Sequence, residues 1–235
     1  MPHLHHVSRS DGILGNVACS SLYQPCFSKA KAGIKPMLIR PFHLTASQRK
    51  KDVSKFVDAL LRGDMGEAKG RYQIVKNSGF KILLTRSLEK AKDYCRNQYA
   101  GKRKKKFGRI ASSGKIFLEN KSNQRKDDIV KWYCDESCYY YCSKLYSVQD
   151  ASKVQGLEFD VPILEWYEDL EWVNGKWKPS HVPEYFDKRT LYSYRVLLTR
   201  GRDGLIIYVP DRTELNDVYD VLRKVGLDDL DKGDY

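Results

Sequence analysis

A short apolar run followed by a capped helix is the feature that most constrains the fold of this chain. Residues 80–85, with the sequence FKILLT, are apolar and β-prone, which is typical of a buried strand. Ser87 then stands at the N-cap position of a helix that turns Leu88 and Ala91 inward. A strand, a short turn and a helix form the unit of a parallel sheet. The sequence therefore predicts an α/β protein with a mostly parallel central sheet flanked by helices.

Other segments alternate between helix and strand in the same way. Apolar residues at helical spacing predict a helix from Asp52 to a capping Gly63, and a second helix is expected over residues 67–76. Asn174-Gly175 predicts the tip of a hairpin, and Asp211 is expected to cap a final helix. The remaining predicted elements are strands over 107–113, 161–166 and 204–210, a helix over 184–200 and a frayed acidic tail from residue 228.

The length of 235 residues suffices for one α/β domain with an extension. Residues 1–39 lack clear patterning and are interpreted as an irregular leader or remnant ahead of a domain over residues 40–235. No stretch approaches the ~18 unbroken apolar residues of a membrane span, and no basic segment leads into a long apolar one. We therefore expect a cytoplasmic protein with neither a membrane span nor a secretion signal.

The net charge of +12 is strongly positive. Such a surplus favours nucleic acid or nucleotide phosphate as a partner, although a soluble basic surface without a partner has the same composition. Residues 101–106, GKRKKK, are expected to form an exposed loop because adjacent cations do not pack. That loop could lie against phosphates or simply be solvated. The tyrosines of residues 132–142 could stack on bases or serve as packing residues.

Three of the six cysteines, Cys134, Cys138 and Cys142, recur at every fourth residue. This spacing would place them on one face of a helix. The chain has no Cys-x-x-Cys pair and no histidine near these residues, so we predict reduced thiols and no metal site. The lack of a secretion signal also favours a reducing compartment.

Two segments carry candidate chemistry. Gln155, Gly156 and Glu158 precede a buried strand. Glycine lets the backbone approach a ligand closely, and a carboxylate beyond it can accept hydrogen bonds from hydroxyl groups such as those of a ribose. Arg200 ends an apolar helix just before Gly201, a placement that suits an arginine finger acting on a transferred phosphoryl group. Alternatively, Arg200 and its neighbours cap the helix or form surface ion pairs.

The segments QGLEFD (155–160) and YRVLLTRGRDGLIIYVP (194–210), about forty residues apart, resemble the end of superfamily 1 helicases. The resemblance is closest to bacterial relatives of the Schlafen group 3 DNA/RNA helicase domain, and it covers roughly residues 40–225. Three earlier segments look like the same group in the same order: LTASQRKKDVSKFVDALLRGD, ILLTRSLEKAKDY and GRIASSGK. The resemblance implies a RecA-like three-layer fold, of the kind found in P-loop NTPases, over residues 40–235.

The resemblance also implies roles for individual residues. Arg49 is expected in a polar turn ahead of a helix and has no functional signal of its own, but it matches an arginine that reaches the γ-phosphate. Arg200 matches the arginine finger. Contacts with the nucleotide are implied for Gln155, Gly156 and Glu158, and on a weaker match for Arg86. Contacts with the nucleic-acid backbone are implied for Ser152 and Lys153. Gln155, Gly156 and Glu158 match a motif that contacts nucleic acid as well. Asp150 departs from the family, because many relatives have threonine there.

A larger departure is the lack of a phosphate loop. The chain contains no Gly-x-x-x-x-Gly-Lys-Ser/Thr sequence, and its adjacent acids Asp127 and Asp128 lie in a polar stretch and not at a strand end. The family would hold ATP and Mg²⁺ between two RecA-like domains, of which we expect this chain to contain only the second. We therefore expect ATP and Mg²⁺ as cofactors only with a complementary N-terminal domain, and neither is expected to bind tightly to this chain alone. We also expect neither ATP hydrolysis nor unwinding by this chain alone.

Two classes of function remain open. In the first, the chain is the C-terminal motor half of an ATP-dependent DNA/RNA helicase, either as a truncated product or as the partner of a separately encoded N-terminal half. In the second, it is a non-catalytic nucleic-acid-binding module. Both classes predict single-stranded or duplex DNA or RNA as a partner. A nuclease function, suggested by the acid-x-lysine spacing of Glu67 and Lys69, lacks a second carboxylate that could be placed beside them.

Overall fold

The computed structural model describes residues 42–102, 104–112, 128–180 and 187–233. The chain divides into the units Met1–Arg40 and Pro41–Tyr235, and every described residue belongs to the second. The predicted leader over residues 1–39 therefore lies outside the described residues, as does the predicted start of a helix at 184–186. None of the helices in the described ranges combines the length and apolar character needed to cross a membrane.

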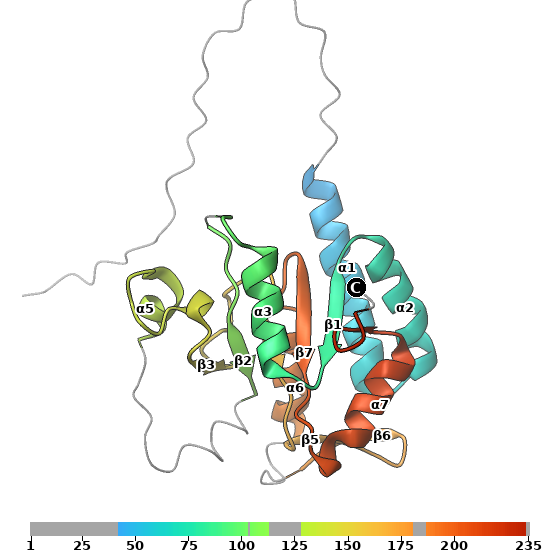
Figure 1. Cartoon of the computed structure of the whole chain (residues 1–235). Helices are drawn as coiled ribbons and strands as arrows, with labels where there is room; N and C mark the ends of the chain where they lie inside the picture. Colours follow the sequence, from blue (N-terminus) through green and yellow to red (C-terminus); the bar gives the residue numbers. More distant parts are fainter. Residues whose placement is uncertain (1–41, 103, 113–127, 181–186, 234–235) are drawn as a thin grey trace, which may run out of the picture. The chain divides into compact units, whose positions relative to one another are not determined.

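The bounds of the elements follow the chain order of Figure 1. The helices are α1 (Phe42–Arg62), α2 (Met65–Asn77), α3 (Leu88–Gln98), α5 (Ile129–Cys134), α6 (Asp187–Leu198) and α7 (Asn216–Val225). The strands are β1 (Lys81–Thr85), β2 (Arg109–Ala111), β3 (Val148–Asp150), β4 (Ile163–Glu165), β5 (Leu170–Val173), β6 (Lys176–Pro179), β7 (Gly204–Tyr208) and β8 (Asp228–Asp229).

Six strands form one sheet in the order β3-β2-β4-β7-β1-β8, and every pair in it is parallel. All of these strands therefore begin at one edge of the sheet and end at the other, an arrangement that decides where the functional side chains can meet. Strands β5 and β6 form a separate antiparallel hairpin. Its tip has positive φ at Asn174 (50°) and Gly175 (78°), which confirms the predicted Asn-Gly turn.

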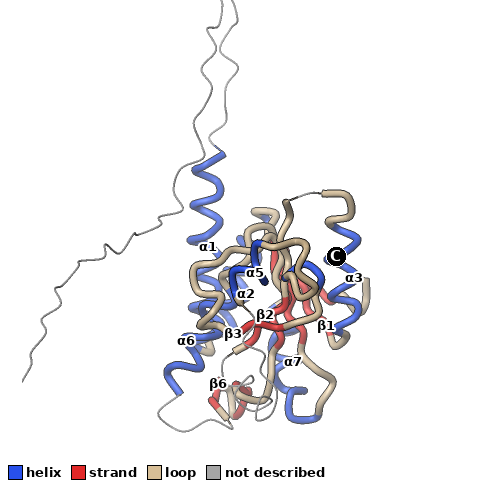
Figure 2. Tube along the Cα trace, turned by 90° about the vertical axis from the view of Figure 1, so that its left-hand side faces the viewer, coloured by secondary structure: helices blue, strands red, loops and turns tan. Residues whose placement is uncertain are grey.

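Helices cover both faces of the sheet, because successive strand residues point to opposite sides. Ile82 and Leu84 belong to a large core that also takes in buried side chains of α1, α2, α6 and α7. Leu83, between them, belongs to a smaller core with Ala91 and Cys95 of α3. Figure 2 shows the strands between α3 and the helices of the other layer. This is the α/β, RecA-like three-layer arrangement that was predicted.

Local signals place several elements as expected. The Ser87 side chain accepts a hydrogen bond from the Lys90 backbone N–H, so the predicted N-cap of α3 is confirmed. Gly63 has a φ of +82° directly after α1, which is the left-handed conformation that glycine adopts at helix ends. Gly63 thus marks the end of α1, and Ser87 marks the start of α3, the helix that follows β1.

The predicted start of the first helix was wrong. Helix α1 begins at Phe42, ten residues before Asp52, so Arg49 lies within a helix and not in a turn ahead of it. Gln, Arg and Lys, which fill residues 48–51, are good helix formers. The apolar pattern begins only at Val53, and that pattern alone set the predicted boundary. The extension matters because it fixes the direction in which Arg49 projects.

The predicted end of the chain was also wrong. Asp211 does not cap α7, because a short 3-10 helix over Thr213–Leu215 intervenes. Asp228 and Asp229 are not frayed: they form β8, which pairs with β1, and Asp228 is 9% exposed. The Lys76 ammonium donates to Asp228 at 2.5 Å, and this ion pair compensates the burial of an acidic residue in a strand.

The three regularly spaced cysteines do not share a helix face. Helix α5 ends at Cys134 because Asp135 is extended, and a turn then returns the Cys138 N–H to the Asp135 carbonyl. Cys142 begins a separate 3-10 helix. All three are free thiols, Cys134 exposed and Cys142 buried. Across the described ranges, no three His, Cys, Asp or Glu side chains gather as a metal site would require.

Candidate functional site

A pocket of about 520 Å³ opens at the edge where the strands of the sheet begin. Its walls come from α1, the residue before β1, the segment before β4, the last turn of α6 and the segment between α6 and β7. We call it the arginine pocket and define it by its charged residues: Arg49, Lys50, Glu158, Arg195, Arg200, Arg202 and Asp203. Five cations thus face two carboxylates, and the pocket has a net positive charge.

Backbone pairing brings two distant segments of the pocket together. The Phe159 N–H donates to the Arg200 carbonyl at 3.1 Å, and the Arg202 N–H donates to the Phe159 carbonyl at 2.8 Å. These bonds continue the β4–β7 pairing beyond the start of both strands. Glu158 and Arg200 are consequently held at adjacent positions, although they lie more than forty residues apart in the sequence.

Glu158 is held by two cations. Its carboxylate accepts a hydrogen bond from Lys50 Nζ at 2.6 Å and from Arg202 Nε at 2.7 Å. The hydrogen bond from Lys50, followed by that from Arg202, lowers the pKa of Glu158 below its ordinary value of 4.5. A carboxylate offers about four lone-pair positions, so Glu158 can still accept a hydrogen bond from a further hydroxyl group.

The lowered pKa gives a prediction for Lys50. The Lys50→Gln substitution is expected to raise the pKa of Glu158 toward 4.5, because Lys50 is the main cause of the lowering. In the unmodified chain, the two ion pairs stabilise the fold above the ordinary pKa and are lost as the pH falls through the lowered one. An NMR titration of the Glu158 carboxyl measures this shift. Arg62→Gln, which removes an exposed cation paired with Glu67, is the control; equal titration curves for both variants would contradict the assignment.

Arg200 keeps its charge free of acidic partners. Its Nε donates to the Val196 carbonyl at 3.0 Å in the last turn of α6, and its Nη1 donates to the Leu157 carbonyl at 3.4 Å. Among the described residues, none of the ion pairs includes Arg200. The guanidinium is therefore oriented by carbonyl groups and not neutralised by a carboxylate, and this leaves its charge for an anion.

Arg49 reaches the same pocket from α1. Its Nε is buried and has no hydrogen-bond partner within the part of the chain that the structure describes. A buried N–H without an acceptor is uncommon in proteins and costs free energy, and an acceptor brought by a ligand would relieve that cost. The structure thus brings Arg49, Glu158 and Arg200 to one pocket at one edge of the sheet.

Arg195 and Arg202 fit the alternative interpretation of this segment, in which its arginines form surface ion pairs. Arg195 forms an ion pair with Asp58 of α1, with 2.7 Å between Nε and Oδ1, and Arg202 pairs with Glu158. Both arginines are about half exposed, so these pairs contribute little to stability. Their geometric effect is to connect α6 and the segment before β7 to the other walls of the pocket.

The remaining predicted residues lie outside the pocket. Gln155 and Gly156 are exposed in the loop before Glu158, and Gly156 has a φ of +89°, which favours glycine. Ser152 and Lys153 follow β3, at the opposite edge of the sheet, where the carboxylate of Asp150 accepts hydrogen bonds from both backbone N–H groups. The roles implied for these four residues stay predictions.

Arg86 also lies at the opposite edge, directly after β1. Its guanidinium donates to the Pro210 carbonyl at 2.7 Å and to Asn216 Oδ1 at 2.8 Å, and it stacks on the Tyr219 ring at 4.2 Å from the centroid. These contacts tie β1 to α7. The structure does not bring Arg86 together with the pocket residues, and we leave it out of the proposed site.

Lys50 and Asp203 line the pocket but were not predicted from the sequence. Lys50 stands beside Arg49 in a run of cations, and nothing in that run distinguishes the residue that meets an acid 108 positions away. Asp203 follows Arg202 directly in the segment already singled out. Its position beside the predicted arginines was the one available signal.

The parallel sheet with helices on both faces, and the cationic pocket at one edge, define a RecA-like α/β protein. A model of the family described as Schlafen group 3, DNA/RNA helicase domain, matches residues 20–211, which is more than half of the chain. The chain therefore belongs to this family, which indicates a helicase-like function and interaction with nucleic acid. No curated protein matched the chain.

Proposed function

We propose that this chain supplies the arginine side of a nucleotide clamp, as the C-terminal motor domain of an ATP-dependent DNA/RNA helicase of superfamily 1. One observation carries the proposal: Arg49, Glu158 and Arg200, which lie on three separate segments, line a single cationic pocket. Arg200 is the arginine finger, Arg49 contacts the γ-phosphate and Glu158 contacts the sugar.

The chemistry of the pocket supports a phosphate ligand. Arginine presents its N–H groups in a planar fork that matches phosphate oxygens. Phosphoryl transfer needs positive charge where negative charge develops, and Arg200 is held by carbonyl groups with no acid to neutralise it. The unpartnered Nε of Arg49 adds a second donor to the same pocket.

ATP and Mg²⁺ complete the proposed clamp only with a second domain. The sequence has no phosphate loop, and the two carboxylates of the arginine pocket are already bonded to cations. A complementary RecA-like domain, encoded separately or in a longer product, holds the triphosphate and Mg²⁺, and Mg²⁺ there neutralises charge on the phosphates. This chain alone then turns over no ATP.

Nucleotide binding tests the proposal. Tight binding of ATP is expected only with the complementary domain, so NMR titration, which detects weak contacts, is used to measure the dissociation constant for ATP of the 235-residue chain alone. Arg200→Ala is expected to weaken ATP binding by about tenfold, the cost of losing one charge-assisted hydrogen bond. Arg96→Ala, which removes an exposed arginine on α3, is the matched control and is expected to leave binding unchanged.

Two results would contradict this proposal. Equal ATP affinities for the Arg200→Ala and Arg96→Ala chains would remove the phosphate ligand from the arginine pocket. Steady ATP hydrolysis by the unmodified chain, abolished in Arg200→Ala, would show that the chain is a complete ATPase and not one side of a clamp.

A second function, that of a non-catalytic nucleic-acid-binding module, is favoured by a specific observation. Arg200 donates to a carbonyl of the preceding helix α6, and Arg195 and Arg202 form ion pairs, as arginines with a structural role do. Such a module would bind single strands with a steep dependence on salt concentration and without any response to nucleotide.

A further inference from the structure

A second pocket, of about 330 Å³, lies beside the arginine pocket on the same edge of the sheet. It opens between α1, α3 and the starts of β1 and β7. We call it the lysine pocket and define it by Arg49, Lys81, Tyr99, Lys102, Lys105 and Asp203. Arg49 and Asp203 line both pockets.

One cation of the lysine pocket is already neutralised. Lys105 Nζ donates to Asp160 and to Asp203, each at 2.8 Å. The Tyr99 hydroxyl donates to Asp203 at 3.3 Å, and burial, followed by Asp203, raises the pKa of Tyr99, so this side chain stays neutral. Residues 101, 102 and 104 are exposed as predicted for this loop, whereas Lys105 and Lys106 are partly buried, because acids beneath the loop draw Lys105 inward.

Three cations of this pocket remain without an acid. Within the described residues, no ion pair includes Arg49, Lys81 or Lys102. Lys81 is the exposed first residue of β1, and the Lys102 ammonium lies 5.6 Å from the centre of the Tyr99 ring. Because Nε of Arg49 is also buried without an acceptor, the pocket combines positive charge with an unsatisfied donor.

We propose that the lysine pocket is a second anion site, which takes a phosphate group between Arg49, Lys81 and Lys102. Two flexible ammonium groups and one guanidinium suit a tetrahedral oxyanion, to which each can present N–H donors. The phosphate can belong to a nucleic-acid backbone or to a small phosphorylated molecule. The site rests on the lining of the lysine pocket, so it can fail while the proposal for the arginine pocket holds.

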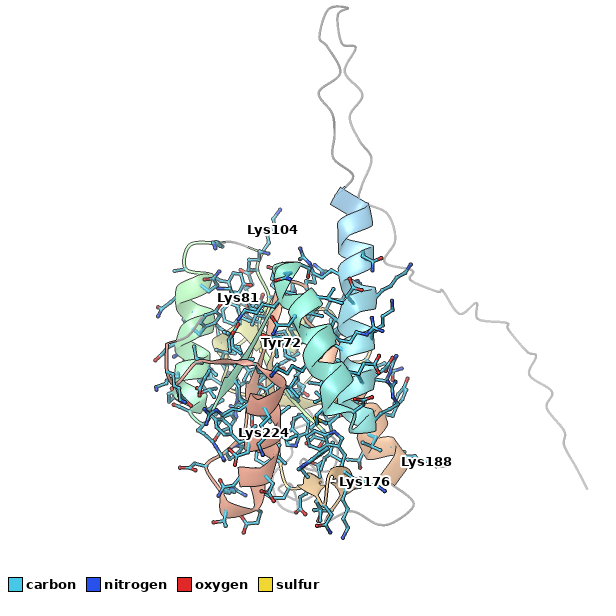
Figure 3. The ribbon with its side chains drawn as sticks, turned by 90° about the vertical axis from the view of Figure 1, so that its right-hand side faces the viewer. Tyr72, Lys81, Lys104, Lys176, Lys188 and Lys224 are labelled. Carbon is cyan, nitrogen blue, oxygen red and sulfur yellow. The ribbon has the colours of Figure 1, made fainter. Side chains whose placement is uncertain are left out.

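Two double variants test the site in the full 235-residue chain. Lys81→Gln with Lys102→Gln removes two charges from the pocket, and both residues are exposed, so folding is preserved. Lys176→Gln with Lys224→Gln removes two exposed charges elsewhere. Figure 3 shows Lys81 above the middle of the described part of the chain and Lys176 and Lys224 below it. The probes are a single-stranded oligonucleotide and inorganic pyrophosphate, with affinity measured over a range of salt concentrations.

The expected result is a loss of affinity in the pocket variant alone. For the oligonucleotide, two lost phosphate contacts reduce the slope of log affinity against log salt by about 1.4 and weaken binding by about tenfold at low salt. A loss confined to the oligonucleotide assigns the site to a nucleic-acid backbone, and a loss for pyrophosphate also assigns it to small phosphates. Equal affinities of the two double variants for both probes would overturn the proposal.

Discussion

Gly201→Ala is expected to lower the free energy of unfolding by about 3 kcal/mol, at the upper end of the usual cost of overpacking. A Cβ atom at residue 201 would lie 1.9 Å from the carbonyl oxygen of Gly204 and 3.3 Å from the Phe80 ring. The first contact is with backbone, so no side-chain rotation can relieve it. The segment between Arg200 and β7 would have to move, and the paired segment of Glu158 would move with it.

Gly70→Ala is the matched control for this prediction. Gly70 lies in α2, and a Cβ there meets nothing within 4 Å, so the substitution is expected to stabilise the protein by about 0.5–1 kcal/mol. Urea denaturation at neutral pH measures both changes. If Gly201→Ala unfolds at the same urea concentration as the unmodified chain, the close approach of residues 201 and 204 does not exist in solution.

The strain expected from the Gly201→Ala substitution shows how the arginine pocket is built. Arg200 and Arg202 face the same pocket from either side of a glycine, and the backbone bonds to Phe159 set their spacing. The positions of the guanidinium groups are therefore a property of the backbone more than of the side chains. Substitutions that leave both arginines in place can still abolish the geometry of the site.

Local signals predicted the fold well where they were strong. The apolar run of β1, the Ser87 cap and the Asn174-Gly175 turn each depend on neighbouring residues alone, and all three were placed correctly. Strand β8 was missed because Asp228 and Asp229 carry no apolar pattern. Their burial depends on Lys76, on Tyr72 and on pairing with β1, which are contacts that no local window contains.

The candidate site was predicted only in part, and for a similar reason. The residue pattern singled out Glu158 and Arg200, and resemblance to a family added Arg49. The structure brings these three residues into one pocket. The lysine pocket has no sequence signature, because Lys81 and Lys102 come from a strand and a loop that only the folded chain places beside Arg49. The net charge of the chain favoured a polyanion but not a place for it, and the loop over 101–106 fitted a phosphate contact and a solvated surface equally well.

Asp160→Ala is expected to lower the free energy of unfolding by about 3 kcal/mol, because it removes the acceptor of two hydrogen bonds, and bonds that involve a charged group contribute about 1.5–3 kcal/mol each. Asp203, which lines both pockets, donates its backbone N–H to the carbonyl of Asp160, and Asp160 is 7% exposed. Its carboxylate accepts hydrogen bonds from Lys105 Nζ at 2.8 Å and from the Lys106 N–H at 2.6 Å. Without it, Lys105 keeps only Asp203, and the loop over 101–106 loses its attachment to the segment before β4.

Asp160→Asn separates charge from hydrogen bonding at this position. The amide oxygen can still accept from the Lys106 N–H, so this variant is expected to lose about half as much stability as Asp160→Ala. Asp93→Ala, which removes an exposed carboxylate paired with Arg96, is the control and should change stability by less than about 0.5 kcal/mol. Urea denaturation ranks the three variants. Equal stabilities of the Asp160→Ala and Asp93→Ala chains would contradict the role of Asp160, whereas the expected ranking would mean that one buried carboxylate fixes the loop that borders the lysine pocket.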